Sequence, residues 1–137
     1  MASPGSGNGV DRVNAQHLEQ GLQYPSMNGR TVFAHATTLM PEVLNSVCTK
    51  SGTALADIDL FFFHQANLRI NSKVAEDMGI PIEKVHSTIQ KFGNTTAATI
   101  PLGMFDAWEA GLLKPGMLIG ASAFGAGFTW GAALWRT

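Results

Sequence analysis

The strongest constraint on the fold of this chain is the stretch at residues 58–63, which ends in three consecutive phenylalanines. The run is too short and too continuously apolar for an amphipathic helix. A strand that is apolar on both faces is typical of a parallel sheet covered by helices on both sides. The sequence therefore predicts an α/β architecture in which this strand lies inside the sheet.

Hydrophobic periodicity and turn residues divide the rest of the chain into alternating helices and strands. The spacing predicts a short helix that is capped by Asn14 and runs through Leu22, followed by helices over residues 30–50, 67–79 and 97–111. It predicts further strands over residues 85–89, 117–124 and 128–135, the last two as an antiparallel hairpin. Pro101 must lie in the first turn of its helix or kink it.

These elements make residues 11–137 one domain, a three-layer α/β unit with a mixed sheet, preceded by a flexible Gly/Ser-rich lead-in at residues 1–10. Such units normally begin with a strand, whereas the first strong element here is the helix at residues 30–50. We therefore expect the unit to lack its first strand.

The composition excludes several classes of protein. Charged residues make up 14% of the chain, against about 25% in an average soluble domain, so we expect part of the surface to pack against another chain. An ordinary apolar α/β domain would also have this composition. The net charge of −1 without a cluster of Lys and Arg argues against a nucleic-acid partner. No apolar run is long enough for a membrane span, and a single cysteine suits a reducing cytoplasm.

The candidate site lies where the predicted strands end. Ligands of open α/β sheets collect beyond the carboxyl ends of the strands, where loops at residues 64–67, 93–96 and 124–127 are expected. His64 and Asn94 from the first two loops could meet at one carbonyl oxygen, and the third loop could offer a backbone N–H. This set of donors suits a reaction through an enolate or a tetrahedral oxyanion. Taken singly, His64 could be a satisfied core histidine and Asn94 a helix cap.

Other chemistries find little support. Cys48 falls on the inward side of the helix at residues 30–50, near its C-terminal end, and is interpreted as a buried structural cysteine. The four histidines have no Cys or carboxylate partners at ligand spacing, so no metal site is predicted. Gly125 and Gly127, with Gly131, do not have the glycine spacing of a nucleotide loop, and a strand follows them instead of a helix.

Three motifs resemble the C-terminal half of 3-oxoacyl-[acyl carrier protein] synthase III, a condensing enzyme of the thiolase superfamily. They are HQANLRI (64–70), KFGNTTAATIP (91–101) and AFGAGFTWGAAL (123–134), in the right order and at the right spacing. The resemblance runs from about Asp11 to Arg136. It implies a half of the thiolase-like fold, with the first strand of that half upstream of Asp11, and an active site formed between two halves.

The resemblance also implies roles for individual residues. His64 and Asn94 match the catalytic pair that stabilises the enolate formed by decarboxylation of a malonyl thioester, and the loop at Gly125, Ala126 and Gly127 matches the turn that completes the oxyanion hole. The family usually has glycine at the position of Ala126, where a methyl group could narrow the pocket or restrict the backbone. Contacts to coenzyme A, to its pantetheine arm or to the carrier protein are implied for Gly29, Phe33, Asn67 and Arg69.

The function implied is the joining of an acyl group from acyl-CoA to malonyl-acyl carrier protein by decarboxylative Claisen condensation, with no permanently bound cofactor. The implied partners are an N-terminal half with the nucleophilic cysteine, which Cys48 does not match, and the acyl carrier protein; the complete enzyme is expected to be a homodimer. Alone, the chain is expected to be inactive. Two alternatives stay open: a non-catalytic fragment or partner subunit, and a coenzyme A-binding α/β module.

Overall fold

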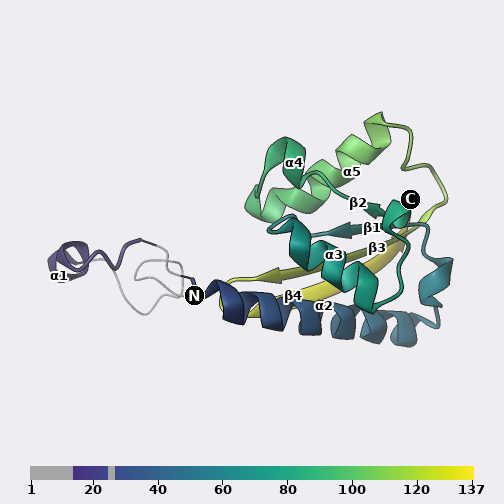
Figure 1. Cartoon of the computed structure of the whole chain (residues 1–137). Coiled ribbons are helices and arrows are strands. Elements are labelled where there is room, and N and C mark those ends of the chain that lie inside the picture. Colours follow the sequence, from purple (N-terminus) through teal and green to yellow (C-terminus); the bar gives the residue numbers. More distant parts are fainter. Residues whose placement is uncertain (1–13, 25–26) are drawn as a thin grey trace.

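The computed structural model describes residues 14–24 and 27–137 of the chain, and its centre is a four-stranded mixed sheet in the order β2-β1-β3-β4 (Figure 1). β1 (Leu60–Phe63) pairs in parallel with both β2 (Val85–His86) and β3 (Leu118–Gly125). β4 (Thr129–Arg136) returns antiparallel to β3, so the predicted terminal hairpin is confirmed. The predicted lead-in at residues 1–10 and the strand expected upstream of Asp11 lie outside the described residues.

The phenylalanine run forms the inner strand that the sequence predicts. Phe61, Phe62 and Phe63 are each 1% exposed. Because successive side chains of a strand point to opposite faces, Phe61 and Phe63 pack into the larger core cluster with α2 and α3, and Phe62 packs into a second cluster on the side of α5. The molecule therefore has three layers, with helices on both faces of the sheet (Figure 1).

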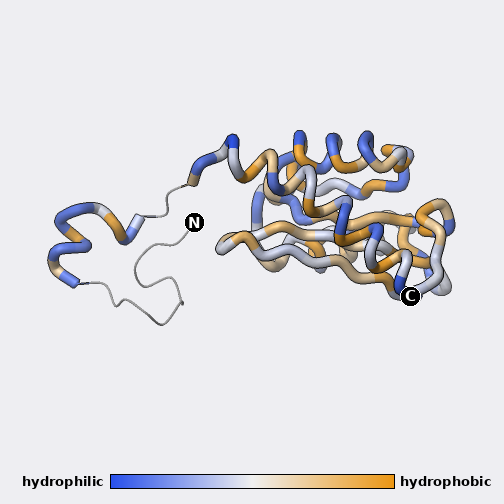
Figure 2. The backbone as a smooth tube through the Cα atoms, turned by 90° about the horizontal axis from the view of Figure 1, so that it is seen from below, coloured by the Kyte–Doolittle hydropathy of each residue, from blue (hydrophilic) through white to orange (hydrophobic). Residues whose placement is uncertain are grey.

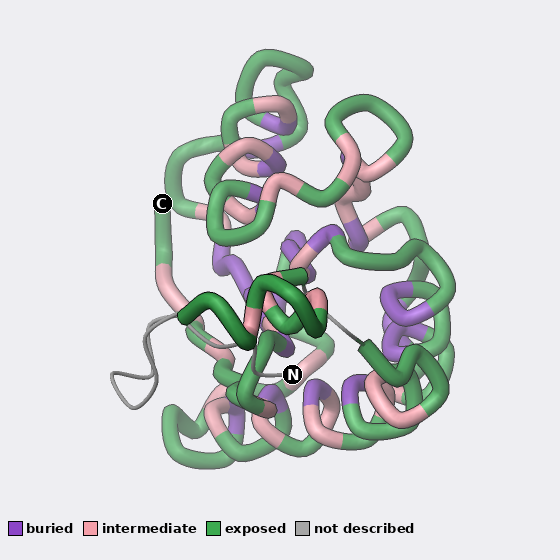
Figure 3. Tube along the Cα trace, turned by 90° about the vertical axis from the view of Figure 1, so that its left-hand side faces the viewer, coloured by how far each residue is buried: buried purple, intermediate pink, exposed green. Residues whose placement is uncertain are grey.

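Helix α2 (Gly29–Ser51) covers one face of the sheet together with α3 (Leu68–Asp77). The side chain of Asn28 caps α2 by accepting a hydrogen bond from the backbone N–H of Thr31 (3.1 Å), and Gly52 ends the helix in the left-handed conformation. Buried residues recur at every fourth position of α2: Ala36, Met40, Leu44 and Cys48. Figure 2 shows hydrophilic and hydrophobic colours alternating along the helical turns, and Figure 3 shows the buried residues on the inward sides of the helices.

Helix α5 (Thr99–Glu109) covers the opposite face and follows a short 3-10 turn, η3 (Thr96–Ala98). Pro101 is the third residue of α5, so of the two alternatives left open by the sequence, the first turn is the one observed. At Gly103, α5 lies close to β1, and a Cβ atom there would make an ordinary van der Waals contact of 3.4 Å with the ring of Phe62. The carboxylate of Asp106 accepts hydrogen bonds from Lys91 and from Nε2 of His86 (3.0 Å), which lower its pKa and join α5 to the β2 side of the sheet.

Several predicted boundaries were wrong. The strand predicted over residues 85–89 stops at His86, and a one-turn helix, α4 (Ile89–Phe92), follows. The backbone N–H groups of Thr88 and Ile89 donate to the side chain of Gln65 (3.1 Å each) and not to a neighbouring strand, so the chain leaves the sheet there. The helix predicted over residues 97–111 is shorter in the structure, where α5 begins at Thr99 and ends at Glu109.

The remaining elements are short. α1 (Ala15–Glu19) is capped by Asn14 as predicted but ends before Leu22, and η1 (Leu55–Asp57) and η2 (Ile82–Lys84) are single 3-10 turns. Within the described part of the chain, no helix has the length and apolar character needed to cross a membrane.

Candidate functional site

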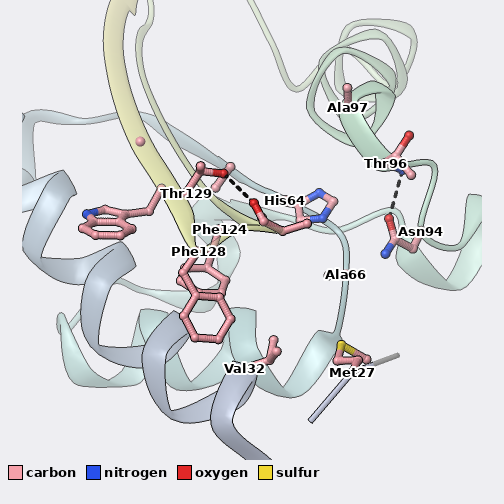
Figure 4. A pocket seen from close by; sticks show the side chains of 15 residues that line it. Met27, Val32, His64, Ala66, Asn94, Thr96, Ala97, Phe124, Phe128 and Thr129 are labelled. Atoms are coloured by element: carbon pink, nitrogen blue, oxygen red, sulfur yellow. Dashed lines mark hydrogen bonds between the residues drawn. The ribbon is translucent and has the colours of Figure 1, made fainter. Parts of the chain in front are cut away.

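A pocket of about 670 Å³ opens at the carboxyl ends of β1 and β3 (Figure 4). Its position beyond the strand ends agrees with the site predicted from the three loops. Fifteen residues line it: Met27, Val32, His64, Ala66, Asn94, Thr96, Ala97, Ala123, Phe124, Gly125, Ala126, Phe128, Thr129, Trp130 and Gly131. The structure thus brings His64, Asn94 and part of the third loop to one cavity.

His64 is the first residue after β1 and is held by its backbone and by its ring. Its backbone N–H donates to the carbonyl of Ser122 on β3 (3.0 Å), which continues the parallel pairing by one residue. The ring is half-buried, and its Nδ1 lies 2.7 Å from the hydroxyl oxygen of Thr99. Burial lowers the pKa of His64 from its usual value of 6.5, so the imidazole is neutral at pH 7.

Gln65 fixes the loop behind His64. Its side chain is 2% exposed and sits among backbone groups. The amide nitrogen donates to the carbonyl of Phe63 (2.9 Å), and the amide oxygen accepts from Ser87 Oγ and from the N–H groups of Thr88 and Ile89 (3.1 Å each). One side chain therefore joins the end of β1 to the segment after β2.

Asn94 is placed by a glycine and by a hydrogen bond of its own side chain. Gly93 has φ 67° and ψ −159°, a conformation essentially restricted to glycine. The Oδ1 atom of Asn94 accepts from the backbone N–H of Thr96 (2.9 Å). Because the oxygen is occupied, the amide nitrogen of this exposed side chain is the end free to donate to a ligand (Figure 4).

The third loop contributes Gly125 and Ala126 to the lining, whereas Gly127 flanks the pocket without being part of its wall. Ala126 does not have a positive φ, so its methyl group adds no backbone strain, contrary to the possibility raised by the sequence. Thr129 Oγ1 donates to the carbonyl of Ala126 (3.2 Å) and steadies the turn.

Backbone strain among the described residues gathers at this pocket. Thr96 (φ 53°) and Phe128 (φ 45°) are the two non-glycine residues there with positive φ, and both line the cavity. A β-branched or bulky residue in this conformation costs about 1–3 kcal/mol and persists only where the surroundings enforce it. Such strain is common at functional sites, which favours a functional interpretation of the pocket.

Four of the predicted contact residues do not line the pocket. Asn67 uses its side chain to cap α3 by accepting from the N–H of Arg69 (2.9 Å), and Arg69 is exposed on that helix. Gly29 begins α2, and Phe33 lies on the exposed side of the same helix. Sequence reasoning missed Met27, Val32 and Trp130, which do line it. Val32, the neighbour of Phe33, is the residue of α2 that lines the pocket.

The described part of the lining contains no cysteine. Cys48 lies in the core cluster under α2, and burial raises the pKa of its thiol, so the prediction that it is buried is confirmed. Among the described residues, no group of three or more His, Cys, Asp or Glu side chains could hold a metal ion.

The chain is one half of a thiolase-like fold. Three features define this class: the layered α/β fold, the parallel strands that end in an antiparallel pair, and the pocket at the strand ends. The comparison with solved structures agrees. The chain superposes on 3-oxoacyl-[acyl-carrier-protein] synthase III from Aquifex aeolicus VF5 with a TM-score of 0.81 and 45% identity, covering 83% of this chain and 37% of that one. For the synthase III from Pseudomonas aeruginosa PAO1 the TM-score is 0.80, with 38% identity and coverage of 82% and 36%.

Residues 48–137 match the family described as "3-Oxoacyl-[acyl-carrier-protein (ACP)] synthase III C terminal". The chain belongs to this family. Among its relatives, the beta-ketoacyl-[acyl-carrier-protein] synthase III of Thermosynechococcus vestitus is 48% identical over 111 residues, which are 81% of this chain and 34% of the relative. That of Synechocystis is 38% identical over 147 residues, covering 99% of this chain and 44% of the relative. The chain thus spans about a third to under half of the length of its curated relatives.

Proposed function

We propose that this chain supplies the oxyanion-stabilising half of a condensing enzyme that joins an acyl group from acyl-CoA to malonyl-acyl carrier protein. The proposal rests on one observation above all: His64 and Asn94, which lie thirty residues apart on separate loops, line the same pocket. The names of the relatives describe such a synthase, and the family to which the chain belongs is that of its C-terminal part.

In the proposed reaction, the C–C bond to the malonyl carboxylate breaks and CO₂ leaves, and its electron pair forms an enolate on the thioester oxygen. The Nε2–H of a neutral His64 and the amide N–H of Asn94 donate to that oxygen. The enolate carbon then attacks an acyl group held as a thioester on a cysteine. The new C–C bond forms as the cysteine thiolate leaves.

The cysteine must come from an N-terminal half, because the thiol of Cys48 is buried in the core. A surface for that half is present on α5 and just beyond it, where Phe105, Trp108 and Leu112 are 62%, 52% and 51% exposed. Large apolar side chains on one side of a helix are costly in water and are typical of an interface. We propose that the N-terminal half covers this face.

The remaining contacts are proposals on the same basis. The exposed guanidinium of Arg69 suits an acidic carrier protein, and Asn67 lies beside it at the start of α3. Gly29 and Phe33 lie on the first turns of α2, next to the pocket residue Val32, where a coenzyme A channel could pass. In this account the complete enzyme is a homodimer of paired halves.

Reconstitution tests the proposal. The purified chain is expected to show no acyl transfer by itself, and mixing it with an N-terminal half of a synthase III is expected to restore condensation of acetyl-CoA with malonyl-acyl carrier protein. The control is the same mixture with an N-terminal half whose catalytic cysteine is replaced by alanine. A folded, stable complex without condensation activity would contradict the proposal and favour a non-catalytic subunit. Tight binding of coenzyme A by the isolated chain would instead favour a binding module.

A further inference from the structure

Thr99 lies directly behind the imidazole of His64. It is the first residue of α5, and its side chain is 3% exposed. Its hydroxyl oxygen lies 2.7 Å from Nδ1 of His64 and 3.1 Å from the backbone carbonyl oxygen of Thr96. The hydroxyl has a single proton, so it can donate to only one of these two acceptors.

The distances indicate which acceptor receives the proton. Hydrogen bonds donated by a hydroxyl group to oxygen are most often about 2.7–2.8 Å long, and the contact to Thr96, at 3.1 Å, is a long one. The contact to Nδ1 is short, as expected for a hydroxyl donor. If Thr99 donates to Nδ1, that nitrogen must be the unprotonated one. A neutral imidazole then has its proton on Nε2.

The segment that presents Thr99 also positions Asn94. The backbone N–H of Thr96 donates to Oδ1 of Asn94, and the carbonyl group of the same residue lies next to the Thr99 hydroxyl. Thr96 itself has a positive φ, and its N–H and its carbonyl group make these two contacts. A short path of contacts therefore connects the two pocket side chains through Thr96 and Thr99, so that their relative placement depends on this turn.

We propose that Thr99 is a positioning residue that holds neutral His64 in the Nε2–H tautomer and thereby presents an N–H donor to the pocket. The tautomer is inferred from the shorter of the two contacts of the Thr99 hydroxyl, whereas its consequence for catalysis rests on the function proposed above. Without the hydroxyl, the imidazole has no partner at Nδ1 and is free to place its proton on either nitrogen. Only the Nε2–H form can then donate to a thioester oxygen while the ring stays neutral.

Nitrogen NMR of the chain labelled with ¹⁵N-histidine tests the tautomer without any activity assay. Spectra are recorded at about pH 8, where a histidine with a pKa at or below its usual value is neutral. The His64→Ala variant identifies the signals of His64 among the four histidines. In the wild type and in Thr99→Ser, we expect a protonated Nε2 and an unprotonated Nδ1. In Thr99→Val, we expect a measurable share of the Nδ1–H form.

Two results would overturn the assignment: a proton on Nδ1 in the wild type, or a Thr99→Val variant with the tautomer ratio of the wild type. The first is read from the unmodified chain, so it does not depend on the folding of any variant. Thr37→Val is the matched control, because its hydroxyl donates to the backbone carbonyl of Phe33 within α2 (2.9 Å) and does not touch a histidine.

The catalytic consequence is measured in the reconstituted synthase. Thr99→Val is expected to lower the rate constant of malonyl decarboxylation by about 10- to 100-fold with a smaller change in KM, and Thr99→Ser is expected to restore most of it. If the spectra show the Nε2–H tautomer but the rate does not respond to Thr99→Val, then the positioning role in catalysis is wrong while the tautomer assignment stands. If the wild-type complex is itself inactive, the proposed function fails separately.

Discussion

Replacing His64 by alanine, or Asn94 by aspartate, is expected to lower the rate of malonyl decarboxylation in the reconstituted synthase by about 10²–10³-fold each. Each change removes one N–H donor aimed at the oxygen on which negative charge develops. Asn94→Asp is the more informative variant, because a carboxylate can still accept the N–H of Thr96 and so keep the shape of the turn. It removes the donor and places a negative charge beside the enolate.

The measurement is release of CO₂ from malonyl-acyl carrier protein, together with thermal unfolding of each variant to show that the fold is retained. Matched controls are His17→Ala, on α1, and Asn45→Ala, on the exposed side of α2. Both controls are expected to leave the rate within about twofold of the wild type, since neither residue lines the pocket. Unchanged rates in the two pocket variants would show that the chain is a non-catalytic partner.

Replacing Gln65 by alanine is expected to lower the free energy of unfolding by about 3–5 kcal/mol. The buried side chain makes four hydrogen bonds to the segments on either side of it, three through its oxygen and one through its nitrogen. Removing it leaves the N–H groups of Thr88 and Ile89 and the carbonyl of Phe63 without these partners. Buried polar groups that lose their hydrogen bonds cost about 1–3 kcal/mol each.

The unfolding free energy of Gln65→Ala is measured by urea denaturation of the isolated chain. Gln90→Ala is the control: the same residue type, also bonded to the loop after β2 through the carbonyl of Ser87 (2.9 Å), but exposed. We expect its effect to stay within about 0.5 kcal/mol. Equal effects at the two glutamines would mean that burial does not determine the contribution of Gln65.

Much of the fold could be predicted because the strongest local signals agree with the tertiary structure. The run Phe61, Phe62 and Phe63 can be buried only inside a sheet covered on both sides, and the structure places these side chains in two separate core clusters. The long helix was predicted within one residue of each end of α2, because its apolar residues recur at helical spacing and Gly52 provides a stop.

The errors came from contacts that join distant segments. The end of β2 depends on the Gln65 side chain, which lies more than twenty residues away in the sequence. Local propensity cannot predict a contact between segments so far apart. The valine, threonine and isoleucine at positions 85, 88 and 89 favour a strand in isolation. Tertiary hydrogen bonding overrides that preference.

The site was partly predictable for a similar reason. Polar residues in the loops that follow predicted strands indicate the carboxyl edge of the sheet, so His64 and Asn94 could be expected at one pocket. The part of the pocket wall formed by Met27, Val32 and Trp130 could not be predicted, because it depends on how α2 and the β3-β4 hairpin pack. The contact between Thr99 and His64 spans 35 positions in the sequence and follows only from the folded arrangement.

The central claim is that the side chains of His64 and Asn94 share one thioester oxygen, and a crystal structure of the reconstituted synthase with a non-hydrolysable malonyl thioester analogue tests it most directly. We expect that oxygen within about 2.7–3.2 Å of both His64 Nε2 and the amide nitrogen of Asn94. An analogue bound in the pocket with its thioester oxygen beyond hydrogen-bonding distance of either donor would contradict the claim.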